Sequence, residues 1–259
     1  MGLLRHTARE KGFHTVFEPA QGELRLLGLG ILSLSAGESW EQQLAGREAA
    51  LVMLGGRAEV WAEGRHWAEV GARENVFAGP ASALYLPAES RLKVSALQPL
   101  RAAVITAPAT NPGEPLLITP EQVTSVWVGR GNTRRTVQTI VGPQFPASRL
   151  LVGETYSDSG CWSSYPPHKH DRACPGKESQ HEEIYYYLLD PPHGFALQRR
   201  YSPAAGLDEA YVIKDGDALA LPCGYHPVVV APGYRLYYLW ALAGEQRVLL
   251  AAQDPALAG

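Results

Sequence analysis

The sequence predicts an all-β protein built from two β-barrels in tandem, and three observations support this fold class. Gly and Pro are plentiful, at 26 and 20 residues, whereas runs of the helix-favouring residues Glu and Lys are scarce. Short apolar runs are separated by turn signals roughly every 8–12 residues. The same pattern occurs on both sides of a stretch rich in Pro and small residues, which indicates a duplicated barrel without a residue-level repeat.

The first half of the chain predicts a series of strands and hairpins. Residues 23–40 have a strand pattern that ends in a Gly-containing turn, and residues 49–71 give three strands separated by a Gly-Gly break and a Glu-Gly turn. Residues 82–97 and 100–109 add further strands. Residues 37–54 also allow a short helix, but their apolar residues cluster at the end and lack helical spacing, so strands are preferred.

Residues 107–120 form the best linker candidate, so we expect a first barrel over residues 1–115 and a second over residues 116–259. The second half then repeats the strand pattern. Strands are predicted within the segments 136–142, 149–157, 182–189, 194–202, 209–222 and 226–242. The turns at 214–217 and 231–234 have hairpin chemistry, because Gly tolerates a positive φ.

Composition excludes several classes of protein. The net charge is -3 and only 19% of residues are charged, so there is no basic surplus that would bind nucleic acid or a membrane surface. The three cysteines are too few, and odd in number, for a disulfide framework, which indicates a reducing compartment. The charged N-terminus lacks the apolar core of a signal peptide, and no apolar run reaches the roughly 20 residues of a membrane helix. We therefore expect a cytoplasmic protein.

A His-x-His pair is the first candidate for chemistry. In a strand, residues two apart point to the same face, so His168 and His170 direct their imidazoles into one space while Lys169 points away. Two imidazoles directed together are a usual start of a divalent metal site. The alternative is a pair of surface histidines in a polar loop.

A carboxylate and a third histidine complete this candidate site. Glu182 and Glu183 open the next apolar run, so one of them faces the interior, where a carboxylate is costly unless it is paired or binds metal. Glu183 is preferred because it shares a face with Tyr185 and Tyr187. His226 follows a strand and a Pro- and Gly-containing turn, which brings it back on an antiparallel neighbour.

This order of residues resembles the two motifs of the cupin family, in which four such side chains converge inside a small β-barrel. The matching residues are Gly160, His168, His170, Gly216, Pro222, Gly224 and His226. The gap before the glutamate is longer than in the family pattern. Residues 171–182, DRACPGKESQHE, are therefore interpreted as an inserted loop at the barrel mouth.

Longer segments resemble the 5-deoxy-glucuronate isomerases of bacterial myo-inositol catabolism. The likeness is strong over Gly129–Gly244, weaker before Gly71, and departs in the tail after residue 244. It implies a bicupin, two cupin-type barrels of the double-stranded β-helix or jelly-roll kind, with metal in the C-terminal barrel only. The sequence agrees, because the histidines of the first half form no His-x-His pair.

The resemblance implies a metal-dependent isomerase, an intramolecular oxidoreductase that interconverts an aldose and a ketose. The reaction would convert 5-deoxy-D-glucuronate to 5-dehydro-2-deoxy-D-gluconate through a cis-enediolate. The expected metal ligands are His168, His170, Glu183 and His226, holding one divalent ion. Zinc or manganese is favoured, and iron or nickel is compatible with these ligands.

Candidates for proton transfer are Glu154, Lys169 and Tyr185. Glu154 has apolar neighbours that would bury it and raise its pKa, although a salt bridge at the barrel rim is an equal alternative. Lys169 is weaker because strand alternation turns it away from the metal.

The residues expected to bind substrate are Arg134, Tyr187, Gln198, Arg200 and Tyr201. Arg135 and Arg199 are alternatives for holding the substrate carboxylate, and core packing or surface exposure is the ordinary role of such residues.

Two other classes of function remain open. One is a related enzyme, such as 4-deoxy-5-keto-uronate isomerase or a metal-dependent dioxygenase. The other is a sugar-binding, storage-like or ligand-sensing bicupin without catalysis, which the retained histidines and the lack of a helix-turn-helix segment disfavour. The expected partner is a small sugar acid, without nucleic acid or membrane, and a homo-oligomer is compatible with the sequence.

Overall fold

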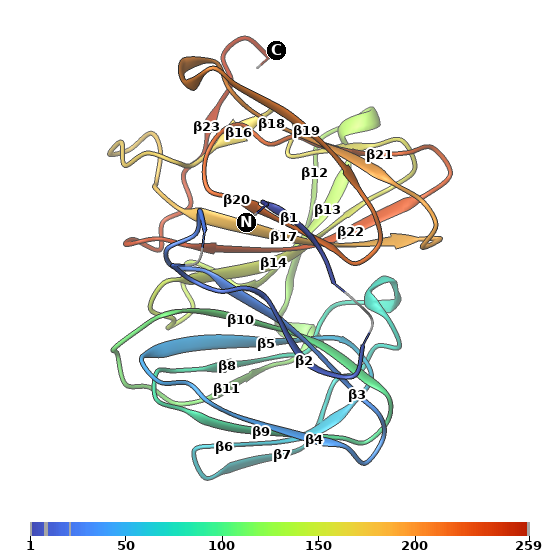
Figure 1. Ribbon diagram of the computed structural model, residues 1–259, viewed down its shortest axis with the longest axis vertical. Coiled ribbons are helices and arrows are strands. Elements are labelled where there is room, and N and C mark those ends of the chain that lie inside the picture. The colour runs from blue at the N-terminus through green and yellow to red at the C-terminus, as the bar shows by residue number, and fades with distance from the viewer. Residues whose placement is uncertain (1, 8–9, 21, 258–259) are drawn as a thin grey trace.

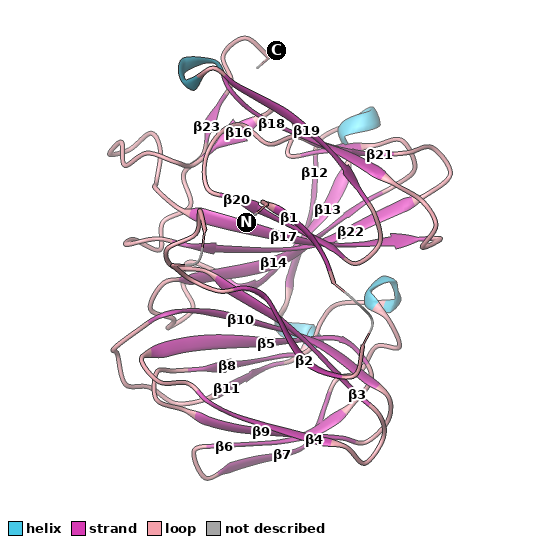
Figure 2. Ribbon diagram, in the orientation of Figure 1, coloured by secondary structure: helices cyan, strands magenta, loops and turns pink. Residues whose placement is uncertain are grey.

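The computed structural model describes residues 2–7, 10–20 and 22–257 and consists of two stacked β-barrels. Figures 1 and 2 show strands throughout both barrels, joined by loops. The helices of the described ranges are single 3₁₀ turns. They are η1 (Val76–Ala78), η2 (Pro120–Gln122), η3 (Gly131–Thr133) and η4 (Pro203–Ala205). The prediction of an all-β tandem fold is confirmed.

The first barrel is made of a six-stranded and a four-stranded sheet. The larger sheet has the order β11 (Leu116–Ile118), β8 (Ala83–Leu86), β5 (Arg47–Gly55), β10 (Leu100–Pro108), β3 (Gly28–Leu34) and β2 (Gly12–Phe17). The smaller sheet has the order β4 (Ser39–Gln43), β9 (Arg91–Ala96), β6 (Ala58–Ala62) and β7 (Arg65–Val70). The segment 37–54, for which a helix was the alternative, thus contains β4 and most of β5.

The second barrel contains one large sheet and two small ones. The large sheet has the order β1 (Leu4–His6), β20 (Asp217–Leu221), β17 (Glu182–Asp190), β22 (Arg235–Ala243), β14 (Leu150–Ser157), β13 (Arg135–Val141) and β12 (Thr124–Val128). The four-stranded sheet has the order β15 (Trp162–Ser163), β21 (Val228–Val230), β18 (Ala196–Ser202) and β19 (Leu207–Ile213). The third sheet pairs β16 (His168–Lys169) with β23 (Ala252–Gln253).

The sheets do not divide at the expected boundary between residues 115 and 116. Strand β11 lies after that boundary, yet it pairs with β8 of the first barrel. Strand β1 lies at the start of the chain, yet it pairs with β20 of the second barrel, with Leu4 opposite Leu219. The start of each expected segment is therefore hydrogen-bonded into a sheet of the other barrel.

The large sheets of the two barrels pack against each other through an apolar core. Strand alternation in β17 shows how one strand serves two cores. Ile184, Tyr186 and Leu188 belong to the core between the barrels, whereas Tyr185 and Tyr187 belong to the core inside the second barrel. A separate apolar cluster fills the first barrel. The inner face of β17 therefore supplies side chains to the interior of the second barrel.

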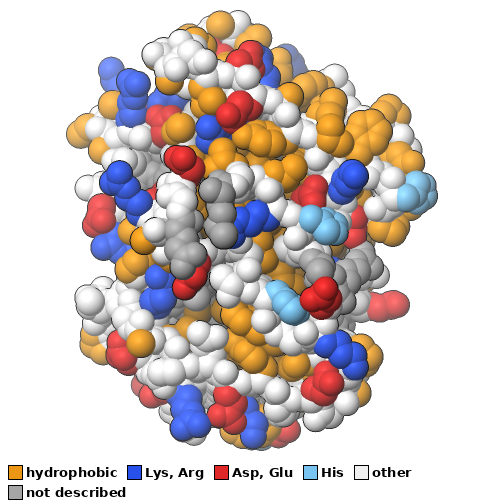
Figure 3. Space-filling model, in the orientation of Figure 1, with side chains coloured by type: hydrophobic (Ala, Val, Ile, Leu, Met, Phe, Trp, Pro, Cys, Tyr) orange, Lys and Arg blue, Asp and Glu red, His pale blue; other side chains and the backbone are white. Residues whose placement is uncertain are grey.

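The surface carries charges of both signs. Figure 3 shows Lys and Arg side chains interspersed with Asp and Glu side chains over the face that it presents. Within the described ranges, no helix has the length and apolar character needed to cross a membrane.

Candidate metal centre

Three histidines converge inside the second barrel. One ring nitrogen from each of His168, His170 and His226 lies within 4.8 Å of the others. Glu183 joins them, because its Oε2 lies 3.0 Å from Nε2 of His170 and 3.1 Å from Nε2 of His226. His170, Glu183 and His226 are almost fully buried. The described side chains thus form a compact group of three imidazoles and one carboxylate.

Short local features place these side chains. His168 and Lys169 form the whole of β16, and their opposite directions follow from the extended backbone. Glu183 begins the inner face of β17, which Tyr185 and Tyr187 continue. His226 follows a tight turn at Gly224, where φ is +91° and an added Cβ would lie 2.9 Å from the carbonyl oxygen of Tyr201. Glycine is therefore required there to bring His226 into the barrel.

Glu182 has a different role. Its carboxylate accepts backbone N–H bonds from Arg25 and Leu26, both at 2.8 Å. It therefore ties a loop of the first barrel to β17. Of the two glutamates between which the sequence left a choice, the geometry brings Glu183 to the histidines and directs Glu182 away from them.

Backbone carbonyls fix the protons on two of the imidazoles. Nδ1 of His226 lies 2.9 Å from the carbonyl oxygen of Gly224, and Nδ1 of His170 lies 3.2 Å from that of His181. A carbonyl oxygen only accepts hydrogen bonds, so each Nδ1 carries a proton, and Nε2 is the ring nitrogen that faces Glu183. Nε2 of His226 is buried and has no hydrogen-bond partner among the described atoms. Ring nitrogens and a carboxylate that converge in this way fit a bound cation.

The ionisation of the group also suits a cation. Burial, with the nearby His226 and His170, lowers the pKa of His168 to about 3. Burial alone would raise the pKa of Glu183, but hydrogen bonds and charge from His170 and His226 lower it to about 2. At neutral pH His168 is therefore neutral and Glu183 is ionised, the states in which both residues can coordinate a metal.

Polar side chains surround the group. The Tyr187 hydroxyl donates to Oε1 of Gln198 at 3.0 Å, and Nε2 of Gln198 donates to the carbonyl oxygen of His226 at 2.5 Å. The Tyr185 hydroxyl lies 3.0 Å from Oγ of Ser164, and its ring contacts that of His226 with centroids 5.9 Å apart. Tyr185, Tyr187 and Gln198 therefore lie where the sequence predicted, inside the barrel.

Ser163 and Tyr238 are barrel residues that sequence reasoning missed. Their hydroxyls are hydrogen-bonded to each other and buried. Tyr238 lies opposite Tyr187 across the β17–β22 ladder. Tyr238 can be recognised as a barrel residue only from the pairing of β22 with β17, and the sequence alone does not reveal that pairing.

The expectation that Glu154 is a proton shuttle at the metal is wrong. Its carboxylate is bound by both terminal nitrogens of Arg73, at 2.5 and 2.9 Å, and accepts hydrogen bonds from Tyr156 and Tyr237. Along β14, Leu150 and Val152 share its face, and that face packs in the core between the barrels. Glu154 therefore lies on the opposite side of the sheet from the histidines.

Lys169, Arg134 and Tyr201 also lie away from the histidine group. Nζ of Lys169 donates to Oδ1 of Asp171 at 2.6 Å and to both oxygens of Glu178 at 2.7 and 2.9 Å. Because these carboxylates bind the ammonium group, the expectation that Lys169 is catalytic is wrong. The guanidinium of Arg134 stacks on the exposed ring of Trp127. The Tyr201 hydroxyl donates to Asp254 at 2.5 Å. Lys169 and Tyr201 lie on the outward faces of their strands, and Arg134 precedes β13 with an exposed side chain. The substrate-binding roles expected for Arg134 and Tyr201 are therefore corrected too.

Two arginines do point into the barrel. Arg200 lies on the same face of β18 as Gln198 and forms an ion pair with Glu209 at 3.2 Å. Arg135 shares the inner face of β13 with Val137, which packs on the second-barrel core. Its Nη1 donates to the carbonyl oxygens of Thr133 at 3.0 Å and Tyr165 at 3.1 Å. Arg135, not Arg134, is therefore the inward member of this adjacent pair.

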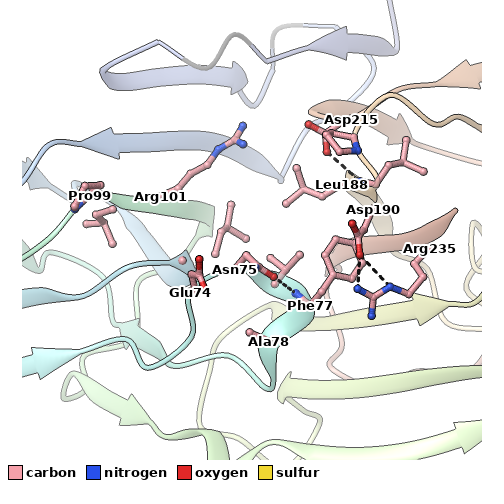
Figure 4. Close-up of a pocket in the computed structure, with 16 residues that line it drawn as sticks. Glu74, Asn75, Phe77, Ala78, Pro99, Arg101, Leu188, Asp190, Asp215 and Arg235 are labelled. Carbon is pink, nitrogen blue, oxygen red and sulfur yellow. Dashed lines mark hydrogen bonds and ion pairs between the residues drawn. The ribbon is translucent and has the colours of Figure 1, made fainter.

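A groove between the barrels is a different feature (Figure 4). It has a volume of about 580 Å³ and reaches Leu188 and Asp190, at the end of β17 opposite to Glu183 and about 23 Å away along the strand. Arg235 pairs with Asp190, and Asn75 accepts a hydrogen bond from the backbone of Phe77. Asp190 and Arg235, two of its labelled charged groups, thus satisfy one another.

Tandem barrels with this buried histidine and glutamate group in one of them define a protein of the bicupin class. Solved structures agree with the fold. The oxalate decarboxylase of Lactobacillus farciminis superposes with a TM-score of 0.71 over 98% of this chain and 88% of that one, at 13% identity. At that identity the likeness concerns the fold alone.

The chain belongs to the KduI/IolB family, whose model matches residues 3–259. The 5-deoxy-glucuronate isomerase of Geobacillus thermodenitrificans is 37% identical over 251 residues, which cover 96% of this chain and 92% of that protein. That of Bacillus subtilis strain 168 is 35% identical over 239 residues, covering 92% and 88%. An IolB-like protein from Salmonella typhimurium has a TM-score of 0.96 and 35% identity over 100% of this chain and 98% of that one. The chain is an isomerase of this family.

Proposed function

We propose that the protein is a metal-dependent aldose–ketose isomerase that converts 5-deoxy-D-glucuronate to 5-dehydro-2-deoxy-D-gluconate through a cis-enediolate. The observation that carries the proposal is the convergence of three imidazoles and Glu183 in a barrel lined by tyrosine hydroxyls. The relatives named 5-deoxy-glucuronate isomerase support the choice of substrate.

His168, His170, Glu183 and His226 would hold one divalent ion. When bound, such an ion supplies Lewis-acid stabilisation of the negative charge that develops on two adjacent substrate oxygens. The nitrogen and oxygen donors fit zinc or manganese, and also iron or nickel. The four side chains would supply three nitrogen donors and one oxygen donor to the ion.

Tyr185 would donate a hydrogen bond to a substrate oxygen near these ligands. Its hydroxyl is paired with Ser164 and its ring lies against His226. Burial, with the nearby charge of Glu183, raises the pKa of Tyr185 well above the usual value. The phenol therefore stays protonated at neutral pH and acts as a donor and not as a base.

Arg135 is the group that we assign to the substrate carboxylate. Two backbone carbonyls hold one end of its guanidinium, and no acidic side chain among the described residues forms an ion pair with it. Burial and the neighbouring histidines lower the pKa of His168, with a smaller contribution from the charge of Arg135, and the same charge opposes the rise that burial causes in the pKa of Tyr238. Arg135 therefore lies near the histidine group. The remaining N–H groups offer a carboxylate the directed hydrogen bonds that arginine forms well.

The test is an NMR assay of the purified protein with 5-deoxy-D-glucuronate, with 4-deoxy-5-keto-uronate as the competing substrate. We expect turnover of the first compound, loss of turnover after chelation, and recovery after a divalent ion is restored. Preferred turnover of the second compound would replace the proposed substrate. Full activity of protein that elemental analysis shows to be metal-free would overturn the metal-dependent mechanism.

A further inference from the structure

We propose that the inserted loop, residues 171–182, is a positioning element that holds the two halves of the metal centre at a fixed separation. Its central residues are Asp171 and Glu178, to which the proposed function gives no role. The inference rests on the proposed metal site, because it concerns how that site is assembled.

Neither half of the centre is held by a long strand. β16, which carries His168, has only two residues, and among the described strands it pairs with the two-residue strand β23. His226 lies between β20 and β21, and backbone hydrogen bonds of Tyr225 and Pro227 to β18 hold the segment that follows the Gly224 turn. Strand β16 and the Gly224 turn itself have few ladder hydrogen bonds, so other contacts must fix their positions.

Asp171 connects these two segments directly. Its Oδ2 accepts the backbone N–H of Gly224 at 2.7 Å, and its Oδ1 accepts from Nζ of Lys169 at 2.6 Å. The carbonyl of Gly224 in turn accepts from Nδ1 of His226 at 2.9 Å. Three hydrogen bonds therefore join Lys169, which lies between His168 and His170, to the third histidine.

Glu178 holds Asp171 in place. Its Oε1 accepts from Lys169 and from the backbone N–H groups of Asp171 and Arg172, at 2.7, 2.8 and 3.0 Å. Its own backbone closes the loop, since the N–H of Cys174 donates to the Glu178 carbonyl at 2.9 Å. Glu178 is buried, so these charge-assisted bonds are shielded from water.

The far end of the loop returns to the other histidine of the pair. The N–H of His181 donates to the carbonyl of His170 at 2.8 Å, and Nδ1 of His170 donates to the carbonyl of His181 at 3.2 Å. The loop is thus hydrogen-bonded to His170 through His181 at its far end, and to the Gly224 turn through Asp171 at its start. This arrangement gives the insert a function in metal binding although none of its side chains joins the histidine group.

Cobalt binding to metal-free protein tests the inference in Asp171→Ala, with Asp208→Ala as the control. Asp208 pairs with Arg199 on the outer surface of the same barrel. We expect Asp171→Ala to weaken cobalt binding by about 10- to 100-fold and to change the visible spectrum of the bound ion, since loss of a group that orients metal ligands has effects of that size. The control should keep the affinity and spectrum of the unchanged protein. Asp171→Asn should recover part of the affinity, because its amide oxygen can still accept from Gly224.

An unchanged affinity and spectrum in Asp171→Ala would overturn the positioning role, as would equal losses in the control. If Asp171→Ala does not fold, Lys169→Met breaks the same connection, and wild-type cobalt binding by that variant would overturn the inference. If the proposed metal site itself is wrong, the unchanged protein will bind cobalt no better than His226→Ala does. That outcome differs from a failure of the positioning role alone.

Discussion

Nε2 of His226 lies 3.1 Å from Oε2 of Glu183, while Nδ1 of the same ring lies 2.9 Å from the carbonyl oxygen of Gly224. A buried carboxylate is unfavourable unless a positive charge lies beside it. The same carboxylate oxygen lies 3.0 Å from Nε2 of His170. The group therefore suits the cation of the proposed function, and its neighbours have roles that can be separated experimentally.

Glu154 is predicted to be structural and not catalytic. Removing its carboxylate in Glu154→Ala leaves the buried guanidinium of Arg73 without its ionic partner, which costs about 3–5 kcal/mol of folding free energy. Urea unfolding measures this loss, and kcat per folded molecule should stay near that of the unchanged protein. A large loss of kcat with unchanged stability would restore Glu154 as a candidate base.

Gln198 is predicted to hold His226 through its backbone. In Gln198→Leu, the buried Tyr187 hydroxyl and the His226 carbonyl each lose a hydrogen bond, and each loss costs about 1–3 kcal/mol. We expect lower stability in urea together with weaker metal binding. Tyr187→Phe, which removes only the outer bond, should have the smaller effect on metal affinity. Equal effects of the two changes would contradict this order.

Arg135 is predicted to recognise the carboxylate of the substrate. Arg135→Met should raise KM for the sugar acid by about 10- to 100-fold, since a charge-assisted hydrogen bond contributes about 1.5–3 kcal/mol. Its effect on an analogue in which an alcohol replaces the carboxylate should be small. Arg134→Met is the matched control, because Arg134 stacks on Trp127 at the surface. The assignment is wrong if the control raises KM as much as Arg135→Met.

Alkaline pH is predicted to destabilise the fold through its buried tyrosines. Burial raises the pKa of Tyr185, Tyr187 and Tyr237 well above the usual value, and burial and Glu209 raise that of Tyr211 to about 12. Unfolded tyrosine has a pKa of about 10, so above that pH the unfolded chain binds fewer protons than the folded one. The free energy of unfolding should therefore fall as pH rises from about 10 to about 12. Urea unfolding with ultraviolet absorbance of phenolate measures both effects. Phenolate formation near pH 10 by Tyr185, Tyr187 and Tyr237 in the folded protein would contradict them.

The sequence predicts the tandem β fold and the residues of the histidine group because both depend on local patterns. Gly turns mark the strand ends, and alternation separates His168 and His170 from Lys169. The same reasoning places Glu183 on one face of its strand with Tyr185 and Tyr187, and in the structure all three side chains do lie inside the second barrel.

Other features depend on partners far along the chain. Apolar neighbours indicate that Glu154 is buried, but they do not reveal which face of the sheet it occupies or that Arg73 in the other barrel binds it. Arg134 and Arg135 are adjacent, so only the register of β13 decides which points inward. The pairing of β1 with β20 is likewise invisible locally, because it joins opposite parts of the sequence.

Metal content tests the central claim most directly, comparing the unchanged protein with Glu183→Gln and Glu182→Gln. Glu183→Gln keeps the size of the side chain but removes the charge beside His170 and His226, whereas Glu182→Gln changes the opposite face of β17, where the carboxylate caps the backbone of Arg25. We predict one divalent ion per chain in the unchanged protein and in Glu182→Gln. In Glu183→Gln, metal affinity should fall by more than about 100-fold, because the loss of a ligand exceeds that of a group that merely orients one. Full metal content and affinity in Glu183→Gln, or loss of metal from Glu182→Gln alone, would contradict the account.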